Sequence, residues 1–191
     1  DLIVELPFVH AVQKAEYFSE AAILLLEELQ CEWVCFGSEK GEIEPFTNTY
    51  ALLAEHADLI DQQAKTFMNA GHSYPKAMAL AYAELKKNYP DMLTLDQPNN
   101  ILGFHYVSAI LKNKLSIKPI TIQRTGSGYH DAALPKDSIA SATAIRKEIT
   151  ADGSLKDVAR FLPGASYDVL RDYQEEMRLW HTWDLYWPYV K

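Results

Sequence analysis

The sequence predicts an α/β fold in which helices cover a parallel sheet. Two observations carry this prediction. Near the N-terminus, two apolar runs typical of buried strands flank an amphipathic helix, and a further strand pattern appears at residues 118–123, behind a long helical stretch. With 191 residues, of which 48% are hydrophobic, the chain is long enough to bury one sizeable core.

The first strand–helix–strand unit spans residues 2–36. Residues 2–6 are predicted to form a buried strand, and residues 16–29 carry apolar side chains at helical spacing. Residues 32–36 form the next strand pattern, which Gly37 ends. A strand, a helix and a strand in this order favour a parallel sheet covered by helices.

A helical insertion is expected at about residues 46–90. One helix is predicted to run through residues 54–68, and a second is predicted to follow Pro75. A third helix is predicted over residues 98–112, because a proline followed by two asparagines supplies start signals.

The strand pattern of residues 118–123 follows this third helix. A loop is expected at residues 124–138, and a helix from about residue 142 to 150. The remainder is predicted to be helical and is rich in aromatic residues. Because a strand pattern begins at once and the aromatic segment stops abruptly at Lys191, we expect further sequence upstream of Asp1 and downstream of the last residue.

Charge and composition narrow the classes of function. The net charge is −8, yet residues 97–130 contain no Asp or Glu, so an anionic ligand is expected to prefer the second half of the chain. No run approaches the roughly 18 apolar residues that a membrane span needs. The two cysteines are interpreted as reduced core thiols, typical of a cytoplasmic protein. No metal site is predicted.

Two loops are expected to share one rim of the sheet. In open α/β sheets, ligands bind beyond the carboxyl ends of the strands. This rule places Gly37 to Glu39, after one strand, near Arg124 to Gly126, after another. The two segments are distant in sequence but are expected to be neighbours in space.

Three residues are candidates for binding a nucleotide: two on this rim and one at the start of the third predicted helix. Gly37 would let the backbone approach a ligand closely, or it simply ends a strand. Asn99 could contact a nucleoside, or it caps its helix. Arg124 could bind phosphate through its guanidinium fork, or it is a solvated side chain before a flexible turn that begins with Thr125.

A helix start further along the chain offers secondary phosphate-facing candidates. Ser141 is predicted to cap this helix, Thr143 lies in its first turn and Arg146 follows about one turn later. The alternative is a well-capped amphipathic helix without a ligand. The sequence has no Walker loop, no G-x-G-x-x-G, no H-E-x-x-H and no G-x-S-x-G motif.

Several blocks resemble the bacterial tRNA(Met) cytidine acetate ligase family, which belongs to the HIGH superfamily of nucleotidyltransferases. The resemblance covers residues 1 to about 150 and, more loosely, the tail. The blocks are DLIVELPF, AEYFSEAAILLLEEL, VCFGSEKGEIE, PNNILGFHYVSAI, KPITIQRTGSGYHD and IASATAIRKEI.

This resemblance implies a Rossmann-like, ATP-binding core. It implies a ligase that activates acetate as acetyl-adenylate and then acetylates N4 of the wobble cytidine of elongator tRNA(Met). ATP-binding positions carry over to Gly37, Asn99 and Arg124, with Thr125 beside the arginine. ATP, acetate and tRNA(Met) are the expected partners, and Mg²⁺ is a possible companion of ATP.

The resemblance also assigns the domains. Residues 1–150 are expected to form the nucleotide-binding α/β domain, and residues 151–191 a helical C-terminal segment. The family's histidine motif has no match in this chain, so the catalytic residues are expected upstream of Asp1 and the sheet is expected to lack its first strand. Alternatives are a nucleotidyltransferase acting on a small cofactor precursor, or a non-catalytic nucleotide- or RNA-binding module.

Overall fold

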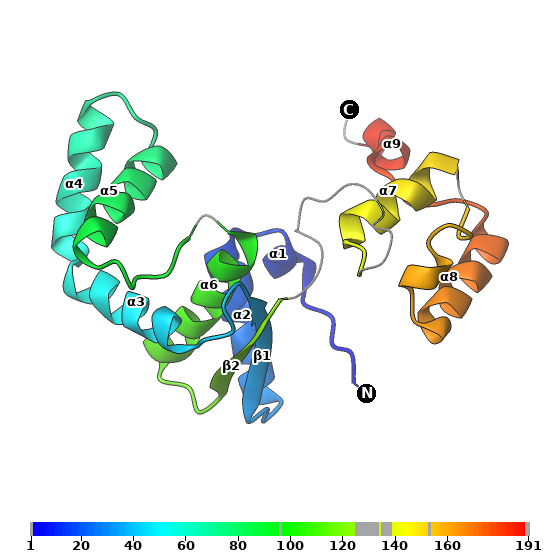
Figure 1. Ribbon diagram of the computed structural model, residues 1–191, viewed down its shortest axis with the longest axis horizontal. Coiled ribbons are helices and arrows are strands. Elements are labelled where there is room, and N and C mark those ends of the chain that lie inside the picture. Colours follow the sequence, from blue (N-terminus) through cyan, green and yellow to red (C-terminus); the bar gives the residue numbers. More distant parts are fainter. Residues whose placement is uncertain (1, 96, 125–133, 135–138, 153, 190–191) are drawn as a thin grey trace. The chain divides into compact units, whose positions relative to one another are not determined.

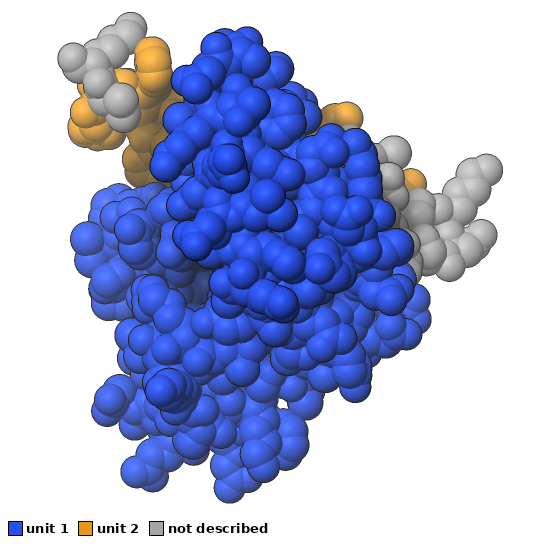
Figure 2. All heavy atoms as spheres, turned by 90° about the vertical axis from the view of Figure 1, so that its left-hand side faces the viewer, with its two compact units in different colours: residues 1–124 blue, residues 125–191 orange. Residues whose placement is uncertain are grey.

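The computed structural model describes residues 2–95, 97–124, 134, 139–152 and 154–189. The chain divides into two compact units, residues 1–124 and residues 125–191 (Figure 2).

The first unit is built around a parallel pair of strands. Strand β1 (Trp33–Ser38) pairs with β2 (Lys118–Gln123) in a continuous register from Trp33 opposite Lys118 to Ser38 opposite Gln123. Among the described residues this sheet has two strands. The parallel pairing confirms the predicted α/β class, and β2 has the bounds expected from its alternating sequence.

The strand predicted at residues 2–6 is wrong. This segment is not paired in the sheet, and Leu2 and Ile3 are 79% and 94% exposed. A short helix, α1 (Phe8–Ala11), follows it. An apolar run forms a β-strand only where a partner strand satisfies its backbone hydrogen bonds. The local sequence does not reveal whether such a partner is present. The observed crossover therefore runs from β1 through helices to β2.

Two helices pack on the sheet. Helix α2 (Ala15–Glu28) and helix α6 (Pro98–Asn113) contact each other, and α6 also contacts both strands (Figure 1). The helices predicted at residues 16–29 and 98–112 are thereby confirmed. Buried apolar residues from these elements form one core cluster: Ile23, Val34, Ala109, Ile110 and Ile117.

Gly103 allows α6 to approach β1 closely. A Cβ atom at this position would lie 2.4 Å from the ring of Phe36 and 2.9 Å from the ring of Phe46. Both distances are shorter than van der Waals contact, so a side chain at residue 103 would push the helix away from the strand. Phe36 and Phe46 fill the space in an edge-to-face pair with centroids 5.4 Å apart.

The helical insertion consists of α3 (Glu44–Glu55), α4 (Ala57–Asn69) and α5 (Tyr74–Asn88). Helices α4 and α5 form a hairpin, visible in cyan and green in Figure 1. The prediction of helices through residues 54–68 and after Pro75 is confirmed for α4 and α5, although His56 separates α3 from α4. The hairpin has its own apolar core: Ile60, Ala64, Ala77, Ala81, Leu85 and Met92.

The second unit is helical. It contains α7 (Ala142–Asp152), a 3₁₀ turn η1 (Ala159–Phe161), α8 (Gly164–Met177), a short α9 (Trp183–Tyr186) and η2 (Trp187–Tyr189). Ile149, Leu155 and Val158 form its buried centre. The boundary between the two compact units falls between residues 124 and 125. The predicted end of the nucleotide-binding domain near residue 150 stays a prediction.

Within the described part of the chain, no helix has both the length and the apolar character that crossing a membrane requires.

Candidate functional site

The carboxyl ends of β1 and β2 bring Gly37 and Arg124 together. The backbone N–H of Arg124 donates to the carbonyl oxygen of Ser38 over 2.9 Å, which continues the parallel pairing by one residue. A Cβ atom on Gly37 would lie 3.1 Å from Cγ of Arg124. The glycine therefore leaves the arginine stem room to lie across the strand end. The expectation of a shared rim is confirmed for the strand end at Gly37 and Ser38 and for Arg124, while residues 125 and 126 lie outside the described residues.

Asn99, at the start of α6, completes this rim. Its Nδ2 donates to Oε1 of Glu39 over 3.2 Å, and its Oδ1 accepts from Nη1 of Arg124 over 3.3 Å. The residue preceding the helix is Gln97, and the helix has no side-chain cap. Capping is thus not the role of the Asn99 side chain in this structure. We call Gly37, Glu39, Asn99 and Arg124 the rim cluster.

Asn100 holds the loop after β1 against α6. Its side chain is only 6% exposed, its Oδ1 accepts from the backbone N–H of Glu39 over 3.3 Å, and its Nδ2 donates to the carbonyl oxygen of Thr94 over 3.1 Å. Both ends of the amide are used, as a buried polar group requires. From its place in the sequence, Asn100 was predicted to mark the helix start together with Asn99, and this role was missed. Its partners lie too far away in sequence for local spacing to reveal them.

The loop itself depends on a buried serine and a glycine. Ser38 Oγ accepts from the backbone N–H of Gly41 over 3.0 Å and lies 2.8 Å from the hydroxyl of Thr121. Gly41 has a φ of 73°, which side chains disfavour, and a Cβ atom there would lie 2.8 Å from the backbone nitrogen of Gln123. The loop therefore turns tightly over the end of β2. Of these residues, only Ser38 was placed on the rim from sequence.

The rim cluster suits a phosphate-bearing ligand. The Arg124 guanidinium presents several N–H donors in a planar fork, and the first turn of α6 leaves backbone N–H groups without helical partners. Glu39 contributes a carboxylate to the cluster, hydrogen-bonded to Asn99. Among the described residues, no group of three or more His, Cys, Asp or Glu side chains could hold a metal ion.

The remaining sequence candidates lie outside unit 1. Thr125 falls outside the described residues. Ser141 caps α7, since its Oγ accepts from the backbone N–H of Ala144 over 3.0 Å, which confirms the predicted cap. Thr143 and Arg146 are exposed on that helix. These residues belong to unit 2, and their phosphate-facing role stays a prediction.

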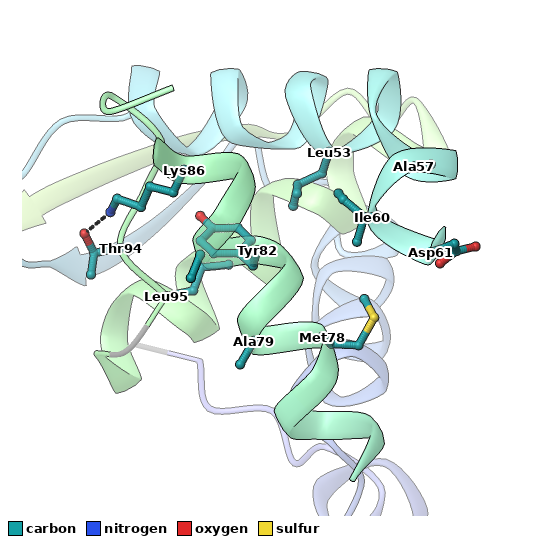
Figure 3. Close-up of a pocket in the computed structure, with 11 residues that line it drawn as sticks. Leu53, Ala57, Ile60, Asp61, Met78, Ala79, Tyr82, Lys86, Thr94 and Leu95 are labelled. Carbon is teal, nitrogen blue, oxygen red and sulfur yellow. Dashed lines mark hydrogen bonds between the residues drawn. The ribbon is translucent and has the colours of Figure 1, made fainter. Parts of the chain in front are cut away.

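Of the cavities that border the insertion, the two with the largest volumes differ in the chemistry of their lining. A cavity of about 480 Å³ adjoins the rim and is lined in part by Ser38, Glu39 and Asn100. A second, of about 630 Å³, lies among α3, α4 and α5, with Lys86 and Thr94 hydrogen-bonded at one side (Figure 3). Its lining is mostly apolar, which would leave a triphosphate without partners. The chemistry therefore favours the rim over the larger cavity.

These features define a class of protein: an α/β protein with a cluster of polar side chains at the carboxyl ends of parallel strands, the edge of such sheets where nucleotides commonly bind. The comparison with protein families agrees. Residues 1–191 match the model described as HIGH Nucleotidyl Transferase, and the chain belongs to this family.

Curated relatives match over the whole chain. A protein of Bacillus licheniformis named tRNA(Met) cytidine acetate ligase is 47% identical over 100% of this chain and 46% of its own length. The Bacillus subtilis protein of the same name is 43% identical, again over 100% of this chain and 46% of its own length. The chain thus spans about half the length of the curated relatives that it matches.

Solved structures agree on the fold. The apo structure of Thermotoga maritima TmcAL superimposes with a TM-score of 0.80 and 28% identity, covering 92% of this chain and 42% of that one. A second TmcAL structure, bound with alpha-thio ATP, superimposes with a TM-score of 0.74 and 27% identity over 92% and 41% of the two chains. The family resemblance inferred from the sequence blocks is confirmed.

Proposed function

We propose that this chain is part of an ATP-dependent ligase that activates acetate as acetyl-adenylate and acetylates N4 of the wobble cytidine of elongator tRNA(Met). The names of the relatives, at 40–47% identity across the whole chain, support this reaction. ATP, acetate and tRNA(Met) are then its substrates. Because tRNA and ATP meet in the cytoplasm, we infer a cytoplasmic location.

The observation that carries the proposal is the rim cluster. Arg124 would bind the phosphates of ATP, Gly37 would let the nucleotide approach the strand end, and Asn99 would orient the nucleoside. Thr125 would add a hydroxyl beside the arginine. The TmcAL structure bound with alpha-thio ATP, which has the same fold, supports a nucleotide in this family.

The proposed reaction has two steps. A carboxylate oxygen of acetate attacks the α-phosphate of ATP, which forms acetyl-adenylate and releases pyrophosphate. The cytidine N4 amine then attacks the acetyl carbonyl carbon, which releases AMP and a proton. In the first step, Arg124 would hold the phosphates in line and offset their charge.

Mg²⁺ is proposed as the companion of ATP. The rim cluster supplies one carboxylate, Glu39, which is less than a site made by protein alone requires. Mg²⁺ usually keeps several waters and binds through one or two carboxylates together with substrate phosphates. The rim is compatible with that mode, because the ATP phosphates would supply the other ligands.

Acetate-dependent exchange of pyrophosphate into ATP, measured with the intact protein, tests the reaction. We expect exchange only when acetate is present. Exchange without acetate, or with a phosphorylated cofactor precursor in its place, would instead support a different nucleotidyl transfer. Absence of all exchange while ATP still binds would support a binding module.

Arg124→Ala tests the site. Loss of a charge-assisted hydrogen bond is expected to weaken ATP binding by about 1.5–3 kcal/mol, measured by calorimetry on the intact protein. Arg171→Ala is the matched control, because Arg171 is an exposed arginine that pairs with Asp168 and Asp172 on α8. Equal ATP affinity of the Arg124 variant and the wild type would remove the arginine from the site.

A further inference from the structure

Glu39 determines which way the Asn99 amide faces. The Glu39 carboxylate only accepts hydrogen bonds, and the Arg124 guanidinium only donates them. With Nδ2 toward Glu39 and Oδ1 toward Arg124, the Asn99 amide satisfies both neighbours, over 3.2 Å and 3.3 Å. The flipped amide would set oxygen against oxygen and N–H against N–H. The three side chains therefore fit together in one orientation.

The backbone of Glu39 is itself anchored. Its N–H donates to Oδ1 of the buried Asn100, whose Nδ2 is held by the carbonyl oxygen of Thr94. Ser38, the residue before Glu39, is also buried, and its Oγ accepts a hydrogen bond from the backbone N–H of Gly41. An exposed carboxylate on a loop is normally free to move, whereas the loop that carries this one is fixed from inside the fold.

We propose that Glu39 is a positioning residue for the nucleotide. It holds the Asn99 amide with its carbonyl oxygen toward Arg124, and this oxygen restrains the guanidinium beside Gly37, ready for phosphate. The inference rests on the proposed binding of ATP at the rim cluster.

Simple electrostatics predicts the opposite sign of effect. A carboxylate near a phosphate site repels the ligand, so removing a bystander acid would strengthen ATP binding. Removing a positioning acid weakens it. The direction of the change therefore separates the two roles.

The experiment measures ATP affinity of the intact protein without acetate, in the presence and in the absence of Mg²⁺. Glu39→Ala is expected to bind ATP about threefold to tenfold more weakly in both conditions, the range for one lost hydrogen bond. Glu39→Gln keeps an acceptor oxygen at the same distance and is expected to restore affinity to within about twofold. Glu42→Ala removes an equal charge three residues along the loop and is expected to bind ATP at least as tightly as wild type.

A double-mutant cycle supplies the readout that a general structural role would not give. If Glu39 acts through Asn99, then Glu39→Ala has no further effect once Asn99→Ala is present. Additive losses, tighter binding by Glu39→Ala, or a loss that appears only with Mg²⁺ would each overturn the proposal, the last by making Glu39 a metal ligand. If Asn99→Ala and Arg124→Ala leave ATP affinity unchanged, the nucleotide site itself is wrong. If they weaken it while Glu39→Ala does not, only the role of Glu39 is wrong.

Discussion

At the carboxyl ends of β1 and β2, side chains from three segments meet through hydrogen bonds, whereas in the α4–α5 hairpin two helices meet through alanines and larger aliphatic side chains. The rim cluster is partly to fully exposed, and its contacts are directional hydrogen bonds. The hairpin core is buried and depends on volume. Substitutions in the two regions should therefore separate ligand affinity from stability.

The largest expected effect is in the hairpin. Leu85→Ala removes a side chain that is 2% exposed and leaves a cavity between α4 and α5, so the free energy of unfolding should fall by about 2–5 kcal/mol. Urea unfolding measures the loss. Leu59→Ala on α4 is the control, because Leu59 is 41% exposed and should cost much less. ATP affinity of the folded Leu85 variant should match wild type, and a large change would show that the two regions are coupled.

Two glycines sharpen the contrast. Gly41 at the rim and Gly71 in the hairpin turn both have positive φ, 73° and 92°. Alanine is strained at either position, by about 1–3 kcal/mol. At Gly41 the new Cβ also meets the Gln123 backbone, whereas at Gly71 it meets nothing within 4 Å. Gly41→Ala should lower the unfolding free energy more than Gly71→Ala does, and it alone should weaken ATP binding. Equal effects of the two substitutions on ATP affinity would contradict the separation.

A smaller loss of stability is expected when the hydroxyl of Tyr82, on α5 of the hairpin, is removed. The Tyr82 hydroxyl donates to the carbonyl oxygen of Leu93, and burial raises the pKa of Tyr82 to about 12. Tyr82→Phe should therefore cost about 0.5–1.5 kcal/mol of stability, measured by urea unfolding, and leave ATP affinity unchanged. Tyr74→Phe, at the exposed first residue of α5, should change stability little. A loss as large as that of Leu85→Ala would mean that this hydroxyl does more than satisfy one carbonyl.

The smallest effect is expected at the opposite, amino end of β2. The pKa of Glu27 is lowered from its ordinary value of 4.5, first by the backbone N–H of Ser116 and then by the Ser116 hydroxyl and the Ile117 N–H. A lowered pKa in the folded state contributes stability above about pH 4.5, which is lost as the pH falls through the folded pKa.

Thermal unfolding between pH 7 and pH 3 measures this contribution. Glu27→Gln should lose part of the dependence on pH at the acidic end, whereas Glu28→Gln, at the exposed neighbouring residue, should follow the wild type. ATP affinity at neutral pH should not change in either variant. Identical pH profiles of the Glu27 variant and the wild type would show that these hydrogen bonds contribute nothing measurable.

The sequence predicted much of the local structure. Strand 118–123 alternates clearly, and the helices after Pro75 and from Pro98 have start signals that depend on neighbours in sequence. It failed for residues 2–6, because a strand exists only with a partner. The sequence correctly placed Gly37 and Arg124 on one rim, because the carboxyl ends of parallel strands lie at the same edge of a sheet.

The finer parts of the site could not be predicted in the same way. The bond from Glu39 to Asn100 joins residues 61 positions apart, and the amide of Asn99 turns to the rim rather than to its own helix. An asparagine near a helix start can always be explained as a helix cap, and the sequence alone does not separate that role from a contact at the rim. Only the packing of α6 on β1 decides between them.

The close approach of α6 to β1 has a consequence for the divergence of this family. Residue 103 admits no side chain while a phenylalanine occupies position 36, since the ring lies 2.4 Å from the missing Cβ. Because the ring of Phe46 lies 2.9 Å from the same point, any lineage that acquires alanine or serine at position 103 should also carry a smaller residue at position 36 and a smaller or shifted side chain at position 46. Asn99 lies in the first turn of the same helix, one turn before residue 103. Lineages that change the residues at positions 36 and 103 should therefore also change the length of the side chain at position 99 or 124.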